Sequence, residues 1–139
     1  MRDVIRKEIG GHEIIFDPGN SLLCVRFNGR VTYESLREFA EELYEDPDYN
    51  QNWDVLIEMG SADFDVSFLD LFHYADHIAK DPRRVLGATA LVSPSLLHYG
   101  IGRMYSGIVG DRLGKLWIER TREPALAWLR AQRAAPPDD

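Results

Sequence analysis

The sequence lacks the features of several common protein classes. Its single cysteine, Cys24, permits no internal disulfide and no cysteine-rich metal site. No apolar run approaches the roughly 18 residues of a membrane-spanning helix, and no apolar stretch follows the first charges, as it would in a secretory signal. We therefore expect a cytoplasmic protein, with peripheral contact at a membrane as an open alternative.

No internal repeat, low-complexity tract or flexible linker divides the 139 residues. This length corresponds to one domain, and 45% apolar with 28% charged residues is typical of a globular chain that folds without metal or disulfide. We expect a single domain over residues 1–133. Residues 134–139 are expected to form a disordered tail, because Pro136 and Pro137 cannot continue a helix.

The chain also lacks a basic excess, because its net charge is −7. The charge is uneven: residues 1–80 have 7 Lys and Arg against 17 Asp and Glu, whereas residues 83–133 have 9 against 3. The acidic first half disfavours nucleic-acid binding, which needs a basic face to displace counterions. The basic second half would attract an anionic surface, although such asymmetry also occurs in proteins without such a partner.

Alternating strand and helix patterns predict the fold. Strand-like apolar segments occur at residues 12–16, 22–27, 53–59, 86–92 and 115–119. Helices are predicted to begin after the capping residues Thr32, Ser67, Ser93 and Thr121. Pro18-Gly19 favours a type II turn between the first two strands. We expect an α/β fold: a small, mostly parallel five-stranded sheet with an N-terminal antiparallel hairpin and four flanking helices. The first nine residues offer a further edge strand.

Four segments carry a recognisable pattern: residues 27–32 (FNGRVT), 53–57 (WDVLI), 99–105 (YGIGRMY) and 125–129 (ALAWL). Together they resemble the SpoIIAA-like family, which is related to STAS domains and to CRAL-TRIO-type lipid carriers. The resemblance covers most of the chain, residues 12–129. It implies a small sheet with helices packed around it. It also implies a role in ligand binding, in peripheral membrane association or in regulatory protein contacts.

One feature of the related proteins is missing. Anti-sigma-factor antagonists, the best understood STAS proteins, are switched by phosphorylation of a Ser that follows an Asp at the start of the second helix. Here Leu71 and Phe72 follow Asp70, and neither Ser61 nor Ser67 directly follows an Asp. We therefore expect a regulatory domain without a phospho-switch.

Candidate catalytic groups are sparse. His73 and His77 have the spacing of a zinc site on a helix, with Asp70 on the same face, but no further ligand completes the set. Cys24 has apolar neighbours and is expected to be inert. Residues 100–102 (GIG) lie inside a helix, whereas dinucleotide binding needs the motif between a strand and a helix. We expect neither enzymatic activity nor a cofactor nor a metal, and a metal-dependent enzyme is the third alternative.

The third helix is unusually rich in glycine. An internal glycine costs about 0.8–1.0 kcal/mol relative to alanine, so its glycines favour close approach of a partner or of a neighbouring helix. The predicted core stripe is Leu97, Ile101, Met104, Tyr105 and Ile108. The opposite face, our candidate binding surface, consists of Leu96, Tyr99, Gly100, Arg103 and Gly107.

These observations predict a non-enzymatic binding or regulatory domain. Leu96 and Tyr99 would supply apolar area, and Arg103 would meet an anionic group, which its planar fork suits. The candidate partners are a small amphipathic ligand or lipid, an anionic membrane surface, or a protein, including a second copy of the chain in a homodimer.

Overall fold

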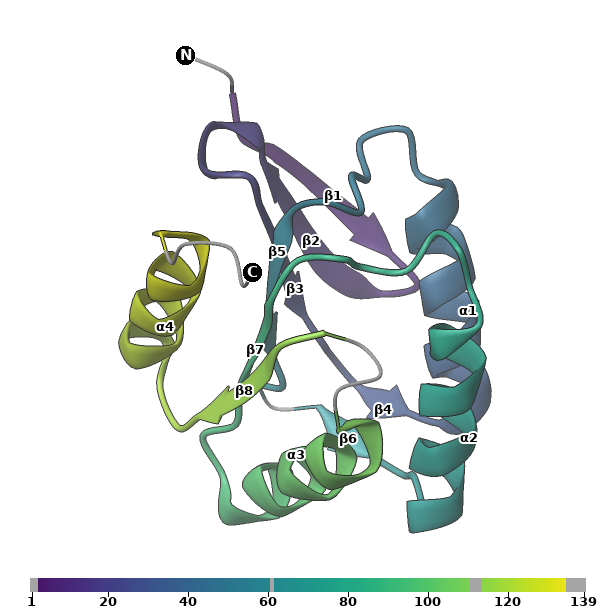
Figure 1. The fold of residues 1–139 in the computed structure, drawn as a ribbon. Helices are drawn as coiled ribbons and strands as arrows, with labels where there is room; N and C mark the ends of the chain where they lie inside the picture. Colours follow the sequence, from purple (N-terminus) through teal and green to yellow (C-terminus); the bar gives the residue numbers. More distant parts are fainter. Residues whose placement is uncertain (1–2, 61, 111–113, 135–139) are drawn as a thin grey trace.

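The computed structural model describes residues 3–60, 62–110 and 114–134, which form a six-stranded sheet and four α-helices (Figure 1). The strand order in the sheet is β1-β2-β3-β5-β7-β8. Its strands are β1 (Ile5–Ile9), β2 (His12–Asp17), β3 (Leu22–Arg26), β5 (Asp54–Glu58), β7 (Thr89–Val92) and β8 (Leu116–Glu119). The helices are α1 (Tyr33–Glu45), α2 (Phe68–Ala79), α3 (Leu96–Val109) and α4 (Arg122–Ala134).

The sheet has an antiparallel part and a parallel part. β1, β2 and β3 form an antiparallel meander, and β3, β5, β7 and β8 run parallel. The predicted α/β fold with an N-terminal antiparallel hairpin is confirmed. The sheet has six strands and not five, because β1 pairs along β2, with Ile5 opposite Phe16. A separate two-stranded sheet of β4 (Arg30–Val31) and β6 (Asp63–Phe64) was not predicted, because two-residue strands leave no periodic pattern.

Helices cover both faces of the sheet. α1, α2 and α3 lie on one face, and α4 lies alone on the other (Figure 1). Each of the first three helices connects neighbouring parallel strands in the same direction across the sheet, so right-handed crossovers place all three on one side. Successive side chains of a strand point to opposite faces. Leu23 and Val25 therefore pack toward α1, whereas Cys24 packs toward α4.

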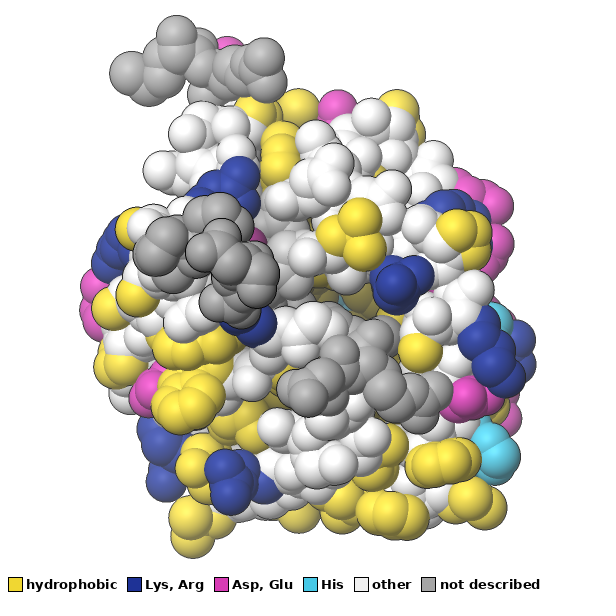
Figure 2. Space-filling model, viewed as in Figure 1, with side chains coloured by type: hydrophobic (Ala, Val, Ile, Leu, Met, Phe, Trp, Pro, Cys, Tyr) yellow, Lys and Arg dark blue, Asp and Glu magenta, His cyan; other side chains and the backbone are white. Residues whose placement is uncertain are grey.

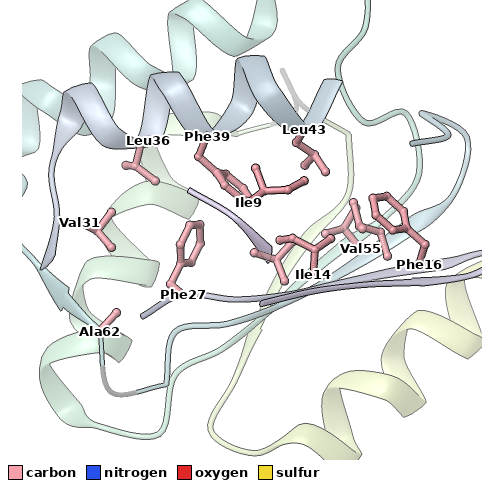
Figure 3. Close-up of a cluster of buried hydrophobic side chains, with 12 residues drawn as sticks. Ile9, Ile14, Phe16, Phe27, Val31, Leu36, Phe39, Leu43, Val55 and Ala62 are labelled. Atoms are coloured by element: carbon pink, nitrogen blue, oxygen red, sulfur yellow. The ribbon is translucent and has the colours of Figure 1, made fainter. Parts of the chain in front are cut away.

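The larger core cluster lies between α1 and the sheet. Leu36, Phe39 and Leu43 point from α1 toward Ile14 on β2 and Phe27, which directly follows β3 (Figure 3). The smaller cluster, on the α4 side, includes Leu56 and Ala90 from the strands and Ala125 and Leu129 from the helix. The spacing of three and four residues in both helices is that of an amphipathic helix with one buried stripe.

Two of the predicted helix starts are capped as expected. The Thr32 Oγ1 accepts a hydrogen bond from the backbone N–H of Ser35, and the backbone N–H of Thr32 donates one to the Ser35 Oγ, which forms a capping box at the start of α1. Ser67 and Asp70 form the same arrangement at the start of α2.

The start of α3 differs from the prediction. Ser95 caps this helix through the backbone N–H of His98, so the predicted cap at Ser93 was wrong by two residues. Ser93 is fully buried, and its Oγ lies 2.9 Å from the sulfur of Met59. The chain after β7 thus remains extended for two more residues before it turns into the helix.

The inward face of α3 is also rotated relative to the prediction. His98, Gly102 and Val109 are its buried residues. Leu97 is 68% exposed and Met104 is 38% exposed, so the predicted core stripe was wrong at these two positions. A buried hydrogen bond of His98 and the small volume of Gly102 determine which side faces the sheet, and apolar periodicity alone reports neither.

A smaller difference concerns the first turn. Residues Pro18–Asn20 form a 3₁₀ turn followed by Ser21 at a φ of 49°, not a type II turn centred on Pro18-Gly19. In α2, Leu71, Ala75 and Ile78 are buried, whereas Phe68 and Phe72 are exposed. α4 extends to Ala134, and residues 135–139 of the expected tail lie outside the described residues. None of the described helices has the length and apolar character needed to cross a membrane.

Candidate functional site

An apolar cavity of about 160 Å³ lies between the sheet and the layer formed by α1, α2 and α3. Its walls come from all three helices and from the strands beneath them. The lining residues from α2 and α3 are Leu71, Tyr74, Ile78, Ile101, Gly102 and Tyr105. Apolar residues from β3, β5, β7 and α1, including Val25, Val55, Leu91 and Ala40, form the remaining walls.

Gly102 positions α3 above this cavity. A Cβ atom at this position would lie 3.4 Å from the Cδ1 of Ile118 and 3.4 Å from the Oγ of Ser93. The helix therefore rests on β7 and β8 through its backbone, because glycine brings no side chain between them. Ile101 and Tyr105, on either side of this contact, extend into the cavity wall.

Tyrosines supply most of the polar groups that line the cavity. Tyr44, Tyr74 and Tyr105 line it together with Thr89, and the rings of Tyr74 and Tyr105 are 6.1 Å apart. Burial raises the pKa of Tyr74 well above its ordinary value, and the nearby Tyr105 and Tyr44 raise it further. These phenols therefore stay neutral at physiological pH and act as hydrogen-bonding groups without charge.

His98 links α3 to the loop that follows β5. Its side chain is buried, and Nε2 lies 2.7 Å from the carbonyl oxygen of Ala62. Because a carbonyl oxygen only accepts, Nε2 donates this hydrogen bond. Nδ1 has no hydrogen-bond partner among the described residues. The ring also packs edge-on against Phe64, which lines the cavity.

The predicted binding surface lies on the opposite side of α3 from the cavity. Leu96 is 77% exposed, Gly100, Arg103 and Gly107 are exposed, and Tyr99 is half-buried. A Cβ at Gly100 or Gly107 would meet no described atom within 4 Å, so these glycines do not serve to admit a neighbouring helix of the same chain. The structure thus places the five predicted residues along one helix face, on which four are exposed and the ring of Tyr99 is partly covered by Arg120.

Further apolar side chains are exposed beside this surface. They are Leu97 and Met104 on α3, and Phe68, Leu69 and Phe72 on α2. Figure 2 shows hydrophobic side chains along the lower edge of the molecule, where α3 and the start of α2 lie. Exposed apolar patches on globular domains frequently mark sites of interaction.

The charged groups at the carboxyl ends of the parallel strands pair with one another. The Glu58 carboxylate lies 2.7 Å from Arg122 and 2.9 Å from Arg26. Burial alone would raise the pKa of Glu58, but hydrogen bonds from Arg122 and Arg26 outweigh it and hold the pKa below its ordinary value. Ligands bind at this edge in many α/β proteins. Here Glu58 at this edge forms ion pairs with Arg26 and Arg122.

The candidate catalytic residues do not converge. No group of three or more His, Cys, Asp and Glu side chains within the described part of the chain is placed to hold a metal ion. His73 is exposed on α2, and Asp70 belongs to the capping box. Burial raises the pKa of the Cys24 thiol, which disfavours the reactive thiolate. Ser67 caps α2, and Ser61 lies outside the described residues.

Sequence reasoning missed the cavity, its lining residue Tyr74 and the buried contact of His98. Tyr74 and His98 were not singled out, and Gly102 was considered only as part of a nucleotide-binding motif. One signal was present: Gly102 lies between Ile101 and Tyr105 on a helix of large side chains. A glycine on the inward face of such a helix indicates close backbone contact and leaves space beside it.

Comparison with solved structures identifies the fold. The chain is similar to an uncharacterized protein of the DUF3478 family with a SpoIIAA-like fold, from Shewanella loihica PV-4. The TM-score is 0.50 at 15% sequence identity, and the similarity covers 91% of this chain and 92% of that chain. The fold is therefore SpoIIAA-like, as the sequence motifs indicated. Neither the protein-family models nor the curated proteins give a match.

Proposed function

We propose that this SpoIIAA-like domain is a non-enzymatic binding module that takes the apolar part of a small amphipathic ligand into the cavity beneath α2 and α3. The observation that carries the proposal is the cavity itself, with its wall of apolar side chains and few polar groups. Small-molecule sites in proteins commonly have this composition.

The energetic cost of the cavity supports a role for it. An enclosed cavity in a protein core costs about 24 cal/mol per Å³, so about 4 kcal/mol is the upper limit for 160 Å³ of space that is partly open to solvent. Globular domains of this size have a total stability of only about 5–15 kcal/mol. A ligand that fills the space would recover part of this cost.

The volume also limits the ligand. An engineered protein cavity of about 150 Å³ binds one benzene molecule, and the cavity described above is only slightly larger. A single ring or a short branched chain fits this space. A long acyl chain would require α2 and α3 to separate from the sheet.

The test measures the binding of benzene and of indole to the folded protein, by calorimetry and by the shift in thermal unfolding. Ala40, a lining residue on α1, is replaced by leucine to fill the cavity, and Val85→Leu is a second filling variant. Ala127→Leu, on the exposed side of α4, is the matched control. We expect both filling variants to lose binding while they stay folded, and the control to bind normally. Binding that survives in folded Ala40→Leu and Val85→Leu would contradict the proposal.

A second candidate function is docking of the outer face of α3 on an anionic membrane. Two observations favour it: the exposure of Leu96 and Leu97, and the placement of Arg103 as the only charged residue of α3. Arg120, whose guanidinium lies 5.7 Å from the Tyr99 ring, adds a second positive charge beside this face. Apolar side chains flanked by arginines suit the boundary between acyl chains and anionic headgroups.

Vesicle sedimentation tests this second function. We expect the chain to bind vesicles that contain phosphatidylserine, to bind less as salt rises, and to lose binding in the double variant Tyr99→Ala, Arg103→Glu. Equal binding by the folded double variant would contradict membrane docking. A shift of the double variant from dimer to monomer, without vesicle binding by either form, would instead identify the face as a protein interface.

A further inference from the structure

We propose that the part of the ligand buried in the cavity is uncharged, has the size of one aromatic ring, and forms its hydrogen bond with the hydroxyl of Tyr74. This inference rests on the proposed function, because it names the chemical class of the ligand that the same cavity takes.

The composition of the wall excludes a buried charge. None of the 22 described residues that line the cavity is an Asp, Glu, Lys, Arg or His. An ionised group transferred into apolar surroundings loses its hydration and finds no counter-charge there, at a cost of several kcal/mol. A ligand that carries a carboxylate or an ammonium would have to keep that group outside the cavity or neutralise it.

Arg83, a charged residue beside the cavity, is already paired. Arg83 lies with its guanidinium 5.6 Å from the ring of Tyr44, one of the lining residues. The same guanidinium is 2.9 Å from Asp81 and 2.9 Å from Glu41. Its positive charge is therefore compensated by two surface carboxylates and is not available to bind an anionic ligand in the cavity.

The polar groups that remain are neutral hydroxyls. Tyr74 lies among them, because its ring centroid is 6.1 Å from that of Tyr105, and Tyr44 lines the same cavity. A phenol both donates and accepts one hydrogen bond. It therefore suits a ligand hydroxyl, carbonyl or ring N–H, and each of these is uncharged.

The experiment compares three probes that share one aromatic ring: benzene, phenol and benzoate. Phenol ionises near pH 10 and a carboxyl group near pH 4, so at pH 7 about one benzoate in 1,000 is the neutral acid. We expect phenol to bind at pH 7 at least as well as benzene. We expect the apparent affinity for benzoate to rise about tenfold for each unit by which the pH falls from 7 to 5. The lining groups that titrate are the three tyrosines, which stay protonated throughout this range.

Variants test the role of the tyrosine. We expect Tyr74→Phe to weaken phenol binding by about 2- to 10-fold and to leave benzene binding unchanged. Tyr49→Phe is the matched control, because Tyr49 does not line the cavity and donates its hydroxyl to the carbonyl oxygen of Arg83. Equal loss of benzene and phenol binding in Tyr74→Phe, or no loss of either, would overturn the assignment to Tyr74.

The two proposals fail in different ways. If benzoate binds at pH 7 as tightly as phenol and without dependence on pH, the cavity accepts charge and the inference is wrong, while the proposed function stands. If benzene, phenol and benzoate all fail to bind the folded protein, the proposed function is wrong and the inference falls with it.

Discussion

The Nε2 atom of His98 lies 2.7 Å from the carbonyl oxygen of Ala62, and this hydrogen bond joins α3 to the loop after β5. The contact determines the rotation of the helix. With His98 turned inward, Gly102 rests on β7 and β8, and Tyr105 lines the cavity. Leu96 and Arg103 are exposed as a result. One buried polar contact thus fixes both the candidate cavity and the candidate surface.

Replacing His98 by leucine should destabilise the protein by about 1–3 kcal/mol, because the buried carbonyl oxygen of Ala62 loses its partner. Urea unfolding measures the change, and hydrogen exchange should show faster opening of α3. His73→Leu, at an exposed position on α2, is the control and should change stability by no more than about 0.5 kcal/mol. Equal stability of the two variants would contradict the role of His98.

Substitutions of the glycines in α3 should change stability in opposite directions, depending on whether the glycine faces solvent or the sheet. Gly100→Ala and Gly107→Ala should each stabilise the protein by about 0.8–1.0 kcal/mol, because the added Cβ meets no described atom within 4 Å and alanine favours a helix. Gly102→Val should destabilise it by about 1–3 kcal/mol, because the side chain would press on Ile118 and Ser93. Thermal unfolding distinguishes the two signs, and a stabilising Gly102→Val would show that α3 does not lie close to the sheet.

Gly87, which precedes β7, should tolerate no side chain. A Cβ at this position would lie 2.4 Å from the carbonyl oxygen of Trp53 and 2.8 Å from the Oδ1 of Asp54, which accepts the backbone N–H of Ala88. We expect Gly87→Ala to lose about 3 kcal/mol or more. Gly19→Ala, whose Cβ would make an ordinary 3.6 Å contact, is the control. Similar melting temperatures for both variants would be inconsistent with this packing.

His12 should make stability depend on pH in the mildly acidic range. It is buried against Phe27 and Phe39, and its Nδ1 accepts the backbone N–H of Asn28 at 3.0 Å. Burial lowers the pKa of His12 below its ordinary value of 6.5. The unfolded chain therefore takes up the proton first, and the contribution to stability is complete above pH 6.5 and declines as the pH falls below it.

The slope from this one residue is at most about 1.4 kcal/mol per pH unit. Denaturant unfolding between pH 7.5 and pH 5 measures it. In His12→Asn the side-chain oxygen can accept the same N–H but does not titrate, so we expect a smaller loss of stability over this range. An identical pH dependence in His12→Asn and the natural chain would assign the effect to other residues.

The sequence predicted the elements whose signals are local. Thr32 and Ser67 are capping residues that act within one helical turn, and both capped the predicted helices. The alternation of Leu23, Cys24 and Val25 between the two faces of β3 also follows from the period of a strand. In each case the residues that determine the structure are neighbours in the chain.

The rotation of α3 could not be predicted in this way. It depends on His98 meeting Ala62, 36 positions away, and on Gly102 meeting Ile118 on the last strand. Apolar or aromatic side chains surround most of the circumference of this helix, at Leu96, Leu97, Tyr99, Ile101, Tyr105 and Val109, so its hydrophobic period does not select one side. The cavity could not be predicted for the same reason. Its walls come from strands and helices that are far apart in the sequence.

The most direct test of the central claim is a methyl NMR titration of the folded protein with phenol. We expect saturable shifts at the methyl groups of Leu71, Ile78 and Ile101, which line the cavity from α2 and α3, and no shift of Leu126 on α4. The Ala40→Leu variant should lose these shifts. Shifts confined to Leu96 and Leu97 on the exposed side of α3, or the absence of any shift at saturating phenol, would contradict a ligand site in the cavity.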